Sequence, residues 1–449
     1  MNRVYVLTLG CDKNRVDGEV MIGSLRLAGY PVVDSPEKAE VIVVNTCGFI
    51  REAVNESIEM ILELAKYKKT HGCRALVVVG CMAERYRDEI LKDLPEIDAC
   101  VGVGQYEKIG EIVGRAGNTS SDIPDATSPI AVGRSLRLAA RTDAKMPHIA
   151  YVKIAEGCDT NCTYCTIPSI RGAYKSRLFE DIVLECRELV ASGVKEIILV
   201  AQNTALYGED IYGTRKLPEL LAQIGKTGVA WLRLMYVYPE HVTPKLVDSI
   251  AGIDCIVKYI DIPLQHCEDS VLKKMGRGFG KYEITSLIRV LRERIQGLAL
   301  RTTLMVGFPG ETDEEFQSLC DFVRETGFER MGVFPYSQEA GTPASRMKHQ
   351  VKDAKKRARY EELMLLQQKI HFESQKKYVG KTLSVMVDEF LPDEGTYTGR
   401  AYFDAPVTDS VICFTSETCL SPGDFCNVFI TETDGYDLVG ERRPNEPAK

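Results

Sequence analysis

The sequence predicts a mixed α/β protein in three parts: an N-terminal parallel αβα sandwich, a central partial (β/α)6 TIM-like barrel and a small C-terminal antiparallel β-barrel. Two series of β-branched runs alternate with amphipathic stretches, and a polar segment separates the two series. The end of the chain carries only short strand-like runs between turn residues. We expect domains at residues 1–115, 148–378 and 379–445, with a linker at 116–147.

Three strands and three helices are expected in the first part, a pattern typical of a parallel sheet with crossover helices. The strands are Val4–Leu9, Val41–Asn45 and Ala75–Gly80. The helices are Val16–Leu27, Ile50–Leu64 and Glu84–Leu91. Gly117–Pro129 has few apolar residues, so it belongs to the linker.

Six strands are expected in the second part, and the functional site of such a sheet lies at the carboxyl ends of its strands. They are Ile149–Ile154, Glu196–Ala201, Trp231–Val237, Val257–Ile262, Ala299–Val306 and Phe328–Phe334, with helices such as Leu178–Ala191, Tyr282–Arg294 and Asp313–Thr326 between them. A long helix, Lys352–Tyr378, leads out of this part. The small barrel follows, with strands Leu383–Val387, Val411–Phe414 and Cys426–Ile430.

The composition is that of a globular protein, because 45% of the residues are hydrophobic and 27% are charged. The sequence shows neither a signal peptide nor an apolar run of membrane length, so we expect a cytoplasmic protein without a membrane partner. Fifteen cysteines are an odd number in a long chain without a secretory signal. They favour metal or redox chemistry over a disulfide framework.

The most specific motif is the Cys-x3-Cys-x2-Cys run of Cys158, Cys162 and Cys165, directly after the first strand of the second series. Three thiolates from one loop can hold three corners of a 4Fe–4S cluster and leave the fourth iron open to a ligand. A structural zinc site would need a fourth nearby ligand. The candidates, His148 and Cys186, fall on a predicted strand edge and in a predicted helix.

A second set of cysteines is spread along the chain but shares one topological position. Cys11, Cys47 and Cys81 each follow one of the first three predicted strands, so in a parallel sheet they lie along one edge and can hold a second, auxiliary 4Fe–4S cluster. Helix N-termini follow them and favour an anionic cluster. The alternative is that they are small buried core residues. We assign that structural role to the nine others, Cys73, Cys100, Cys186, Cys255, Cys267, Cys320, Cys413, Cys419 and Cys426.

Small polar residues and glycines at other strand ends predict a cofactor cradle, because glycine lets the backbone approach a ligand and polar side chains orient it. They are Gln202, Asn203, Gln265, His266, Gly307 and Gly310. Taken singly, each also has a simpler interpretation: a Gly-Pro-Gly sequence forms a turn, and a lone histidine is satisfied within its loop.

The charge is unevenly distributed. Residues 381–449 carry 13 acidic and 5 basic residues, which accounts for the whole net charge of −8. A module that grips RNA needs basic residues for phosphate contacts, so this acidic segment argues against RNA binding and favours a basic protein partner. The alternative is a solvated acidic surface without a partner.

The spacing of Cys158, Cys162 and Cys165, with the aromatic Tyr164 before the last cysteine, resembles the signature of radical S-adenosylmethionine (SAM) enzymes. The resemblance implies that the open iron binds S-adenosyl-L-methionine, with Tyr164 beside it. It also implies that reduction yields a 5′-deoxyadenosyl radical, while the protein provides positioning and exclusion of water.

The order of the three parts resembles the methylthiotransferases of this superfamily, whose C-terminal barrel is a TRAM domain. The resemblance implies two 4Fe–4S clusters. The radical formed at the Cys158 cluster abstracts a hydrogen atom from an unactivated carbon. The auxiliary cluster then presents a sulfur methylated by a second S-adenosyl-L-methionine. The electrons come from a one-electron donor such as a flavodoxin or a ferredoxin.

The first cysteine motif distinguishes the subfamilies. Leu9-Gly-Cys-Asp-Lys-Asn-Arg-Val-Asp-Gly-Glu19 is similar to the Leu-Gly-Cys-x-Lys-Asn-x-Val-Asp-Ser-Glu pattern of the ribosomal-protein subfamily, with Gly18 in place of the serine. The implied substrate is the β-carbon of an aspartate in small ribosomal subunit protein 12. Two alternatives stay open: methylthiolation of a modified adenosine in tRNA, whose enzymes tend to read Phe-Gly-Cys-Gln-Met-Asn, and a non-catalytic iron–sulfur carrier or RNA-binding scaffold.

Overall fold

The computed structural model describes residues 1–116 and 146–443, so nearly all of the expected linker, including Gly117–Pro129, lies outside the described residues. The chain divides into two compact units. The first unit comprises Met1–Lys145, Tyr151–Thr160 and Cys165–Glu188. The second comprises Met146–Ala150, Asn161–Tyr164 and Leu189–Lys449. The domain boundaries expected from the sequence stay predictions.

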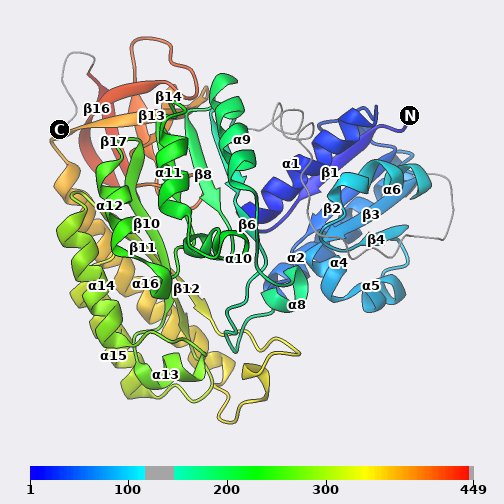
Figure 1. Cartoon of the computed structure of the whole chain (residues 1–449). Helices are drawn as coiled ribbons and strands as arrows, with labels where there is room; N and C mark the ends of the chain where they lie inside the picture. The colour runs from blue at the N-terminus through cyan, green and yellow to red at the C-terminus, as the bar shows by residue number, and fades with distance from the viewer. Residues whose placement is uncertain (117–145, 444–449) are drawn as a thin grey trace. The chain divides into compact units, whose positions relative to one another are not determined.

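The first unit contains a parallel sheet of order β1-β2-β3-β4, shown in blue to cyan in Figure 1. Its strands are β1 (Val4–Thr8), β2 (Val41–Thr46), β3 (Ala75–Gly80) and β4 (Ala99–Val101). Its main helices are α1 (Asp12–Leu27), α2 (Arg51–Ala65), α4 (Cys81–Arg85), α5 (Arg87–Asp93) and α6 (Ile109–Ala116). The expected helix Glu84–Leu91 is instead divided between α4 and α5, because Tyr86 leaves the helical region at φ −128° and ψ 28°.

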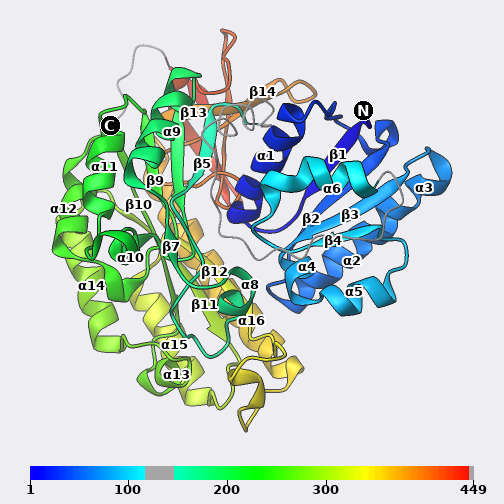
Figure 2. The same cartoon turned by 45° about the vertical axis from the view of Figure 1, so that its right-hand side comes forward.

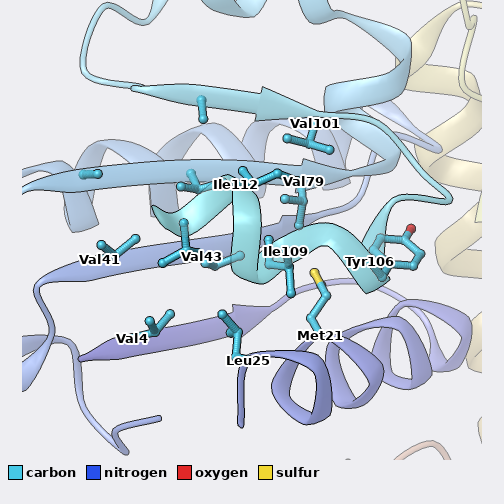
Figure 3. Packing of buried hydrophobic residues seen from close by; sticks show 14 residues of the cluster. Val4, Met21, Leu25, Val41, Val43, Val79, Val101, Tyr106, Ile109 and Ile112 are labelled. Atoms are coloured by element: carbon cyan, nitrogen blue, oxygen red, sulfur yellow. The ribbon is translucent and has the colours of Figure 1, made fainter. Parts of the chain in front are cut away.

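Alternate residues of the central strand β2 pack into two hydrophobic cores, one on each face of the sheet. Val41 and Val43 face α1 and α6 in one core, shown in Figure 3, while Ile42 and Val44 pack with residues of α2 in the other. This follows from the two-residue period of a strand and from the burial of both faces of a parallel sheet. The first part is therefore an αβα sandwich, as predicted.

The second sheet has the order β12-β11-β10-β9-β8-β5, in which every strand neighbours the next one in sequence. Its strands are β5 (Ile149–Lys153), β8 (Glu196–Val200), β9 (Trp231–Leu234), β10 (Ile256–Gln265), β11 (Ala299–Val306) and β12 (Arg330–Pro335). The intervening helices include α11 (Leu217–Gly225), α12 (Pro244–Gly252), α14 (Lys281–Arg294) and α15 (Asp313–Thr326). Figure 2 shows α11, α12 and α14 along one side of these strands, the arrangement expected of a partial (β/α)6 barrel.

Helix α16 (Asp353–Gln375) leads to a closed five-stranded barrel. Its strands are β13 (Thr382–Leu391), β14 (Thr396–Arg400), β15 (Ile412–Thr415), β16 (Phe425–Asp434) and β17 (Asp437–Arg442). The barrel is antiparallel as predicted, except that β15 and β17 are parallel. The exception is geometric, because a closed ring with an odd number of strands cannot alternate direction throughout.

Buried ion pairs fasten this barrel to the second sheet. Arg400 of β14 lies 2.9 Å from Glu196 of β8, and Glu196 also pairs at 2.6 Å with Arg233 of β9. Asp404, after β14, pairs with Arg330 of β12. No helix among residues 1–116 and 146–443 is long and apolar enough to cross a membrane.

Candidate active site

Cys11, Cys47 and Cys81 follow the carboxyl ends of β1, β2 and β3 respectively. Cys11 is the residue before α1 and is exposed, Cys47 comes directly after β2 and is buried, and Cys81 is the first residue of α4 and is buried. Since the three strands are parallel neighbours, the cysteines lie at the same edge of the sheet.

Close packing of the strand ends brings this edge together. Gly10 has a φ of +86°, and a Cβ at this position would lie 2.8 Å from Cβ and 3.1 Å from Sγ of Cys47. Only glycine fits there. Burial raises the pKa of the Cys81 thiol to about 11, the nearby Arg171 guanidinium opposes this rise, and the charges of Cys11 and Cys47 add to it. The three thiols are therefore within range of one another's charge.

Asn14 ties these strand ends to each other. Its Nδ2 donates to the backbone carbonyl oxygens of Leu9 at 3.0 Å and Thr46 at 2.9 Å. The backbone carbonyl of Asn14 accepts from Nδ2 of Asn45 at 2.9 Å. Its Oδ1 lies 3.6 Å from Sγ of Cys81. Hydrogen bonds between buried groups of this kind fix the position of the backbone from which the cysteines project.

A buried ionic cluster lies beside Cys81, all of it within the first unit. Nη2 of Arg171 is 3.2 Å from Sγ of Cys81, and Nη1 donates to Asp17 at 3.1 Å and to Glu156 at 2.9 Å. Nζ of Lys153 donates to the same two carboxylates, at 2.5 Å for Glu156. Burial alone would raise the pKa of Glu156, but Arg171 and Lys153 hold it well below its ordinary value.

Tyr106 completes the surroundings of Cys81. It follows β4, its side chain is buried, and Figure 3 shows it at the end of the hydrophobic core. Its hydroxyl has no hydrogen-bond partner among the described residues, although Asp17, Arg171 and Cys81 lie within range of its charge. A buried hydroxyl without a partner is uncommon and suits a site whose ligand supplies an acceptor.

The Cys158–Cys165 loop begins after the short strand β6 (Ala155–Glu156). Cys158 and Cys165 belong to the first unit, and Cys162 belongs to the second. Gly157 has a φ of +78°, and a Cβ there would lie 2.2 Å from the carbonyl oxygen of Ala173, so no side chain fits. The loop is thus held close to the chain that follows it.

Backbone amides stabilise two of the sulfur atoms in this loop. The amide of Thr160 donates to Sγ of Cys158 and that of Ile167 donates to Sγ of Cys165, each at 3.4 Å. Such donors favour the thiolate form, which is the form that binds iron.

Tyr238 and Arg277 surround Cys162 in the second unit. The Tyr238 hydroxyl lies 3.8 Å from Sγ of Cys162, and the Arg277 guanidinium lies 4.3 Å from the centre of the Tyr238 ring. Arg277 is buried and pairs with Glu240 at 3.2 Å. No sequence motif marks Tyr238 or Arg277, although Tyr238 follows β9, the one inner strand of the sheet for which no site residue is predicted.

The predicted cofactor-cradle residues lie at the carboxyl ends of β8, β10 and β11. After β8, Nδ2 of Asn203 contacts Nδ1 of His241 at 2.8 Å, and Gln202 precedes it. Gln265 ends β10 with a φ of +73°, uncommon for a residue other than glycine. Backbone outliers of this kind cluster at functional sites. A role in binding S-adenosyl-L-methionine stays a prediction.

Other predicted cradle residues already form hydrogen bonds with nearby protein groups. Nδ1 of His266, which is buried, accepts from the amide of Glu268 at 3.0 Å. The amide of Gly307 donates to the carboxylate of Glu311, and that of Gly310 donates to the carbonyl of His349 at 2.9 Å.

The Tyr164 ring packs edge-on against Phe308, with ring centres 6.4 Å apart. Tyr164 therefore contacts the loop after β11, close to the predicted glycines.

The donor set suits iron–sulfur chemistry. None of the 15 cysteines, all within the described part of the chain, forms a disulfide. Among the described residues, no three His, Cys, Asp or Glu side chains surround one point as the ligands of a single ion would. A 4Fe–4S cluster needs a different arrangement, since each thiolate binds a different iron. Three thiols per set, amide donors and the unpaired Tyr106 hydroxyl fit such clusters.

Three family models match the chain. Residues 3–102 match Uncharacterized protein family UPF0004, residues 152–323 match the Radical SAM superfamily and residues 379–442 match the TRAM domain. The fold resembles that of the radical S-adenosylmethionine methyltransferase TsrM from Kitasatospora setae, with a TM-score of 0.54 and 15% identity over 85% of this chain and 80% of that one. It also resembles the cobalamin-dependent S-adenosylmethionine radical enzyme OxsB, with a TM-score of 0.52 and 11% identity over 82% of this chain and 56% of that one.

Sequence relatives match from end to end. The "Ribosomal protein uS12 methylthiotransferase RimO" of Thermoanaerobacter sp. (strain X514) is 45% identical over 98% of this chain and 100% of its own length. The protein of the same name from Heliobacterium modesticaldum is 45% identical over 98% of this chain and 95% of its own length. The chain therefore belongs to the RimO family and is a radical SAM methylthiotransferase.

Proposed function

We propose that the enzyme transfers a methylthio group to the β-carbon of an aspartate in ribosomal protein uS12, and that it does so in the cytoplasm. The observation that carries the proposal is the placement of one cysteine after each of β1, β2 and β3, in addition to the Cys158–Cys165 loop. Relatives that match from end to end and are named for uS12 support the substrate.

The two cysteine sets have separate roles in this proposal. Cys158, Cys162 and Cys165 hold a 4Fe–4S cluster, with Tyr164 and the ends of β8, β10 and β11 around the cofactor. S-adenosyl-L-methionine would bind there and, on one-electron reduction by a flavodoxin or ferredoxin, would supply the radical chemistry that removes a hydrogen atom from the substrate carbon. Cys11, Cys47 and Cys81 hold the auxiliary cluster, which presents the sulfur. Such chemistry requires exclusion of water, because a carbon radical would otherwise be quenched before its capture.

The test uses the full chain, reconstituted with iron and sulfide without oxygen and reduced with dithionite. It is incubated with S-adenosyl-L-methionine and either a uS12 peptide containing the aspartate or a tRNA anticodon stem. We expect about eight irons per chain for two four-iron clusters. We also expect a methylthio mass gain on the peptide alone. A gain on the RNA alone would overturn the substrate, and failure to cleave S-adenosyl-L-methionine would indicate a non-catalytic carrier or scaffold.

Two variants in the same assay separate the cysteine sets. We expect Cys158→Ala to abolish 5′-deoxyadenosine, measured by chromatography, because it removes a ligand of the radical-generating cluster. We expect Cys47→Ala to leave 5′-deoxyadenosine largely intact but to stop sulfur insertion. Cys419→Ala, which removes an exposed thiol outside both sets, is the matched control. Equal loss of radical formation in the first two variants would contradict the division of roles.

A further inference from the structure

Arg171 follows the Cys158–Cys165 loop in sequence but contacts Cys81, a member of the other cysteine set. We propose that Arg171 is a positioning residue that holds the Cys81 sulfur by a charged hydrogen bond and thereby raises the reduction potential of the auxiliary cluster. This inference rests on the proposed function, because it requires a cluster on Cys11, Cys47 and Cys81.

Distance and burial make the Arg171 charge effective. Its Nη2 lies 3.2 Å from Sγ of Cys81, and 2% of its side chain is exposed. A charged hydrogen bond in a dry environment is stronger than one in water, because the surroundings screen it less. A cation beside a thiolate ligand lowers the energy of the reduced cluster, which carries one more negative charge, relative to the oxidised cluster.

The other terminal nitrogen of Arg171 is held by two buried carboxylates. Nη1 contacts Asp17 at 3.1 Å and Glu156 at 2.9 Å, and Lys153 contacts both acids as well. These contacts fix the plane of the guanidinium, so its second edge is directed at Cys81. They also set a charge of opposite sign behind it. Removal of the arginine and removal of the aspartate should therefore shift the potential in opposite directions.

The experiment isolates the auxiliary cluster in the full-length protein. In a chain carrying Cys158→Ala, Cys162→Ala and Cys165→Ala, the Cys11, Cys47 and Cys81 set is the only one of the two left. After anaerobic reconstitution, iron is counted and the cluster is titrated with dithionite, and electron paramagnetic resonance follows its one-electron reduction. Binding of about four irons shows that the auxiliary cluster forms. Absence of iron would refute the proposed function itself, before the role of Arg171 is in question.

In that background we expect Arg171→Gln to make the cluster harder to reduce. A lost charged hydrogen bond of ordinary strength corresponds to about a tenfold fall in the reduction equilibrium constant. For one electron this is a shift of about 59 mV to more negative potential. We expect Asp17→Asn to shift the potential to more positive values. Unchanged potentials, or shifts of the same sign in both variants, would overturn the proposal while the cluster itself remained established.

Two more variants separate charge from structure. Arg171→Lys keeps the positive charge, so we expect it to recover part of the lost potential. Arg177→Gln removes a nearby arginine that pairs with Glu185 at 2.7 Å, and we expect it to leave the potential unchanged. If the Arg171→Gln protein does not bind iron, the Asp17→Asn variant provides the test. A shift of its reduction potential to more positive values supports the proposal, and an unchanged or more negative potential overturns it.

Discussion

His266 illustrates at the residue scale how burial sets protonation. Its imidazole is fully buried, its Nδ1 accepts from a backbone amide, and its Nε2 has no partner among the described residues. Burial lowers the pKa of His266 to about 4. Because the unfolded chain takes up this proton near pH 6.5, acid favours the unfolded state. Above pH 6.5 His266 is neutral in both states, so it does not reduce the free energy of unfolding. As the pH falls from 6.5 toward 4, the free energy of unfolding decreases, because only the unfolded chain takes up the proton.

We expect His266→Gln to flatten the pH dependence of stability. Between pH 8 and pH 5 the wild-type protein should lose about 2 kcal/mol more free energy of unfolding than the variant. Urea unfolding at both pH values measures this difference. His71→Gln, which removes an exposed imidazole, is the control. Parallel pH profiles for wild type and His266→Gln would show that His266 is not held neutral.

The six candidate cysteines can be proposed from the sequence because their signal is local: three lie in one motif, and three each follow a strand-like run. Arg171, Tyr106 and Tyr238 could not. Each approaches a cysteine only after folding, from an element remote in sequence, and no fixed spacing relates the two. Asn14 stood inside a recognised motif, but the motif gave no indication of which groups its side chain would contact.

At the scale of elements, the most consequential contact is the one between β14 and β8. The Arg400 guanidinium bridges Asp388 of β13 and Glu196 of β8, and both it and Glu196 are buried. Truncating one member of a buried ion pair leaves its partners with uncompensated charge, which costs more than an exposed pair ever contributes.

We therefore expect Arg400→Met to lower the free energy of unfolding by about 3–5 kcal/mol, measured by urea denaturation. The control is Arg443→Met, because Arg443 pairs with Glu441 at 2.6 Å on the partly exposed rim of the same barrel. Loss of that pair should cost about 1 kcal/mol or less. Similar losses in the two variants would mean that Arg400 does not hold the barrel to the sheet.

Elements with a strong apolar pattern, such as the strand β3 and the helix α15, were predicted nearly to the residue. Some short ones were missed. β4 has three residues, and β14 contains a glycine and an arginine whose burial only the barrel explains. Sequence patterns carry too little information over such lengths, and tertiary packing decides the structure.

At the scale of the whole molecule, the outer surface of the C-terminal segment is less acidic than the count of its charged residues suggests. Of its 13 acidic residues, Asp388, Asp404 and Asp409 are directed inward and pair with arginines, so they do not contribute to the outer surface. A count of charges in the sequence cannot distinguish these from exposed ones. The excess of acid nevertheless persists outside, for example at Glu389, Asp393 and Glu394 around the β13–β14 turn.

We expect a triple reversal at this turn, Glu389→Lys, Asp393→Lys and Glu394→Lys, to raise the KM for a basic uS12 peptide about tenfold at low salt. The effect should shrink as salt is added, because exposed charges are screened. The control reverses three exposed acids of α2, Glu52, Glu56 and Glu59. Equal changes in KM for the two triple variants would assign the effect to net charge rather than to the barrel.

The buried ion pairs between barrel and sheet also limit how the barrel can act. A domain on a flexible linker could reach many positions. This barrel cannot, because the buried ion pairs of Arg400, Glu196 and Arg330 fix it to the sheet. Any segment that bound to the barrel would therefore stay at a fixed distance from the strand ends of the same unit. The number of residues between the bound segment and the modified side chain would then decide which side chain reaches the site.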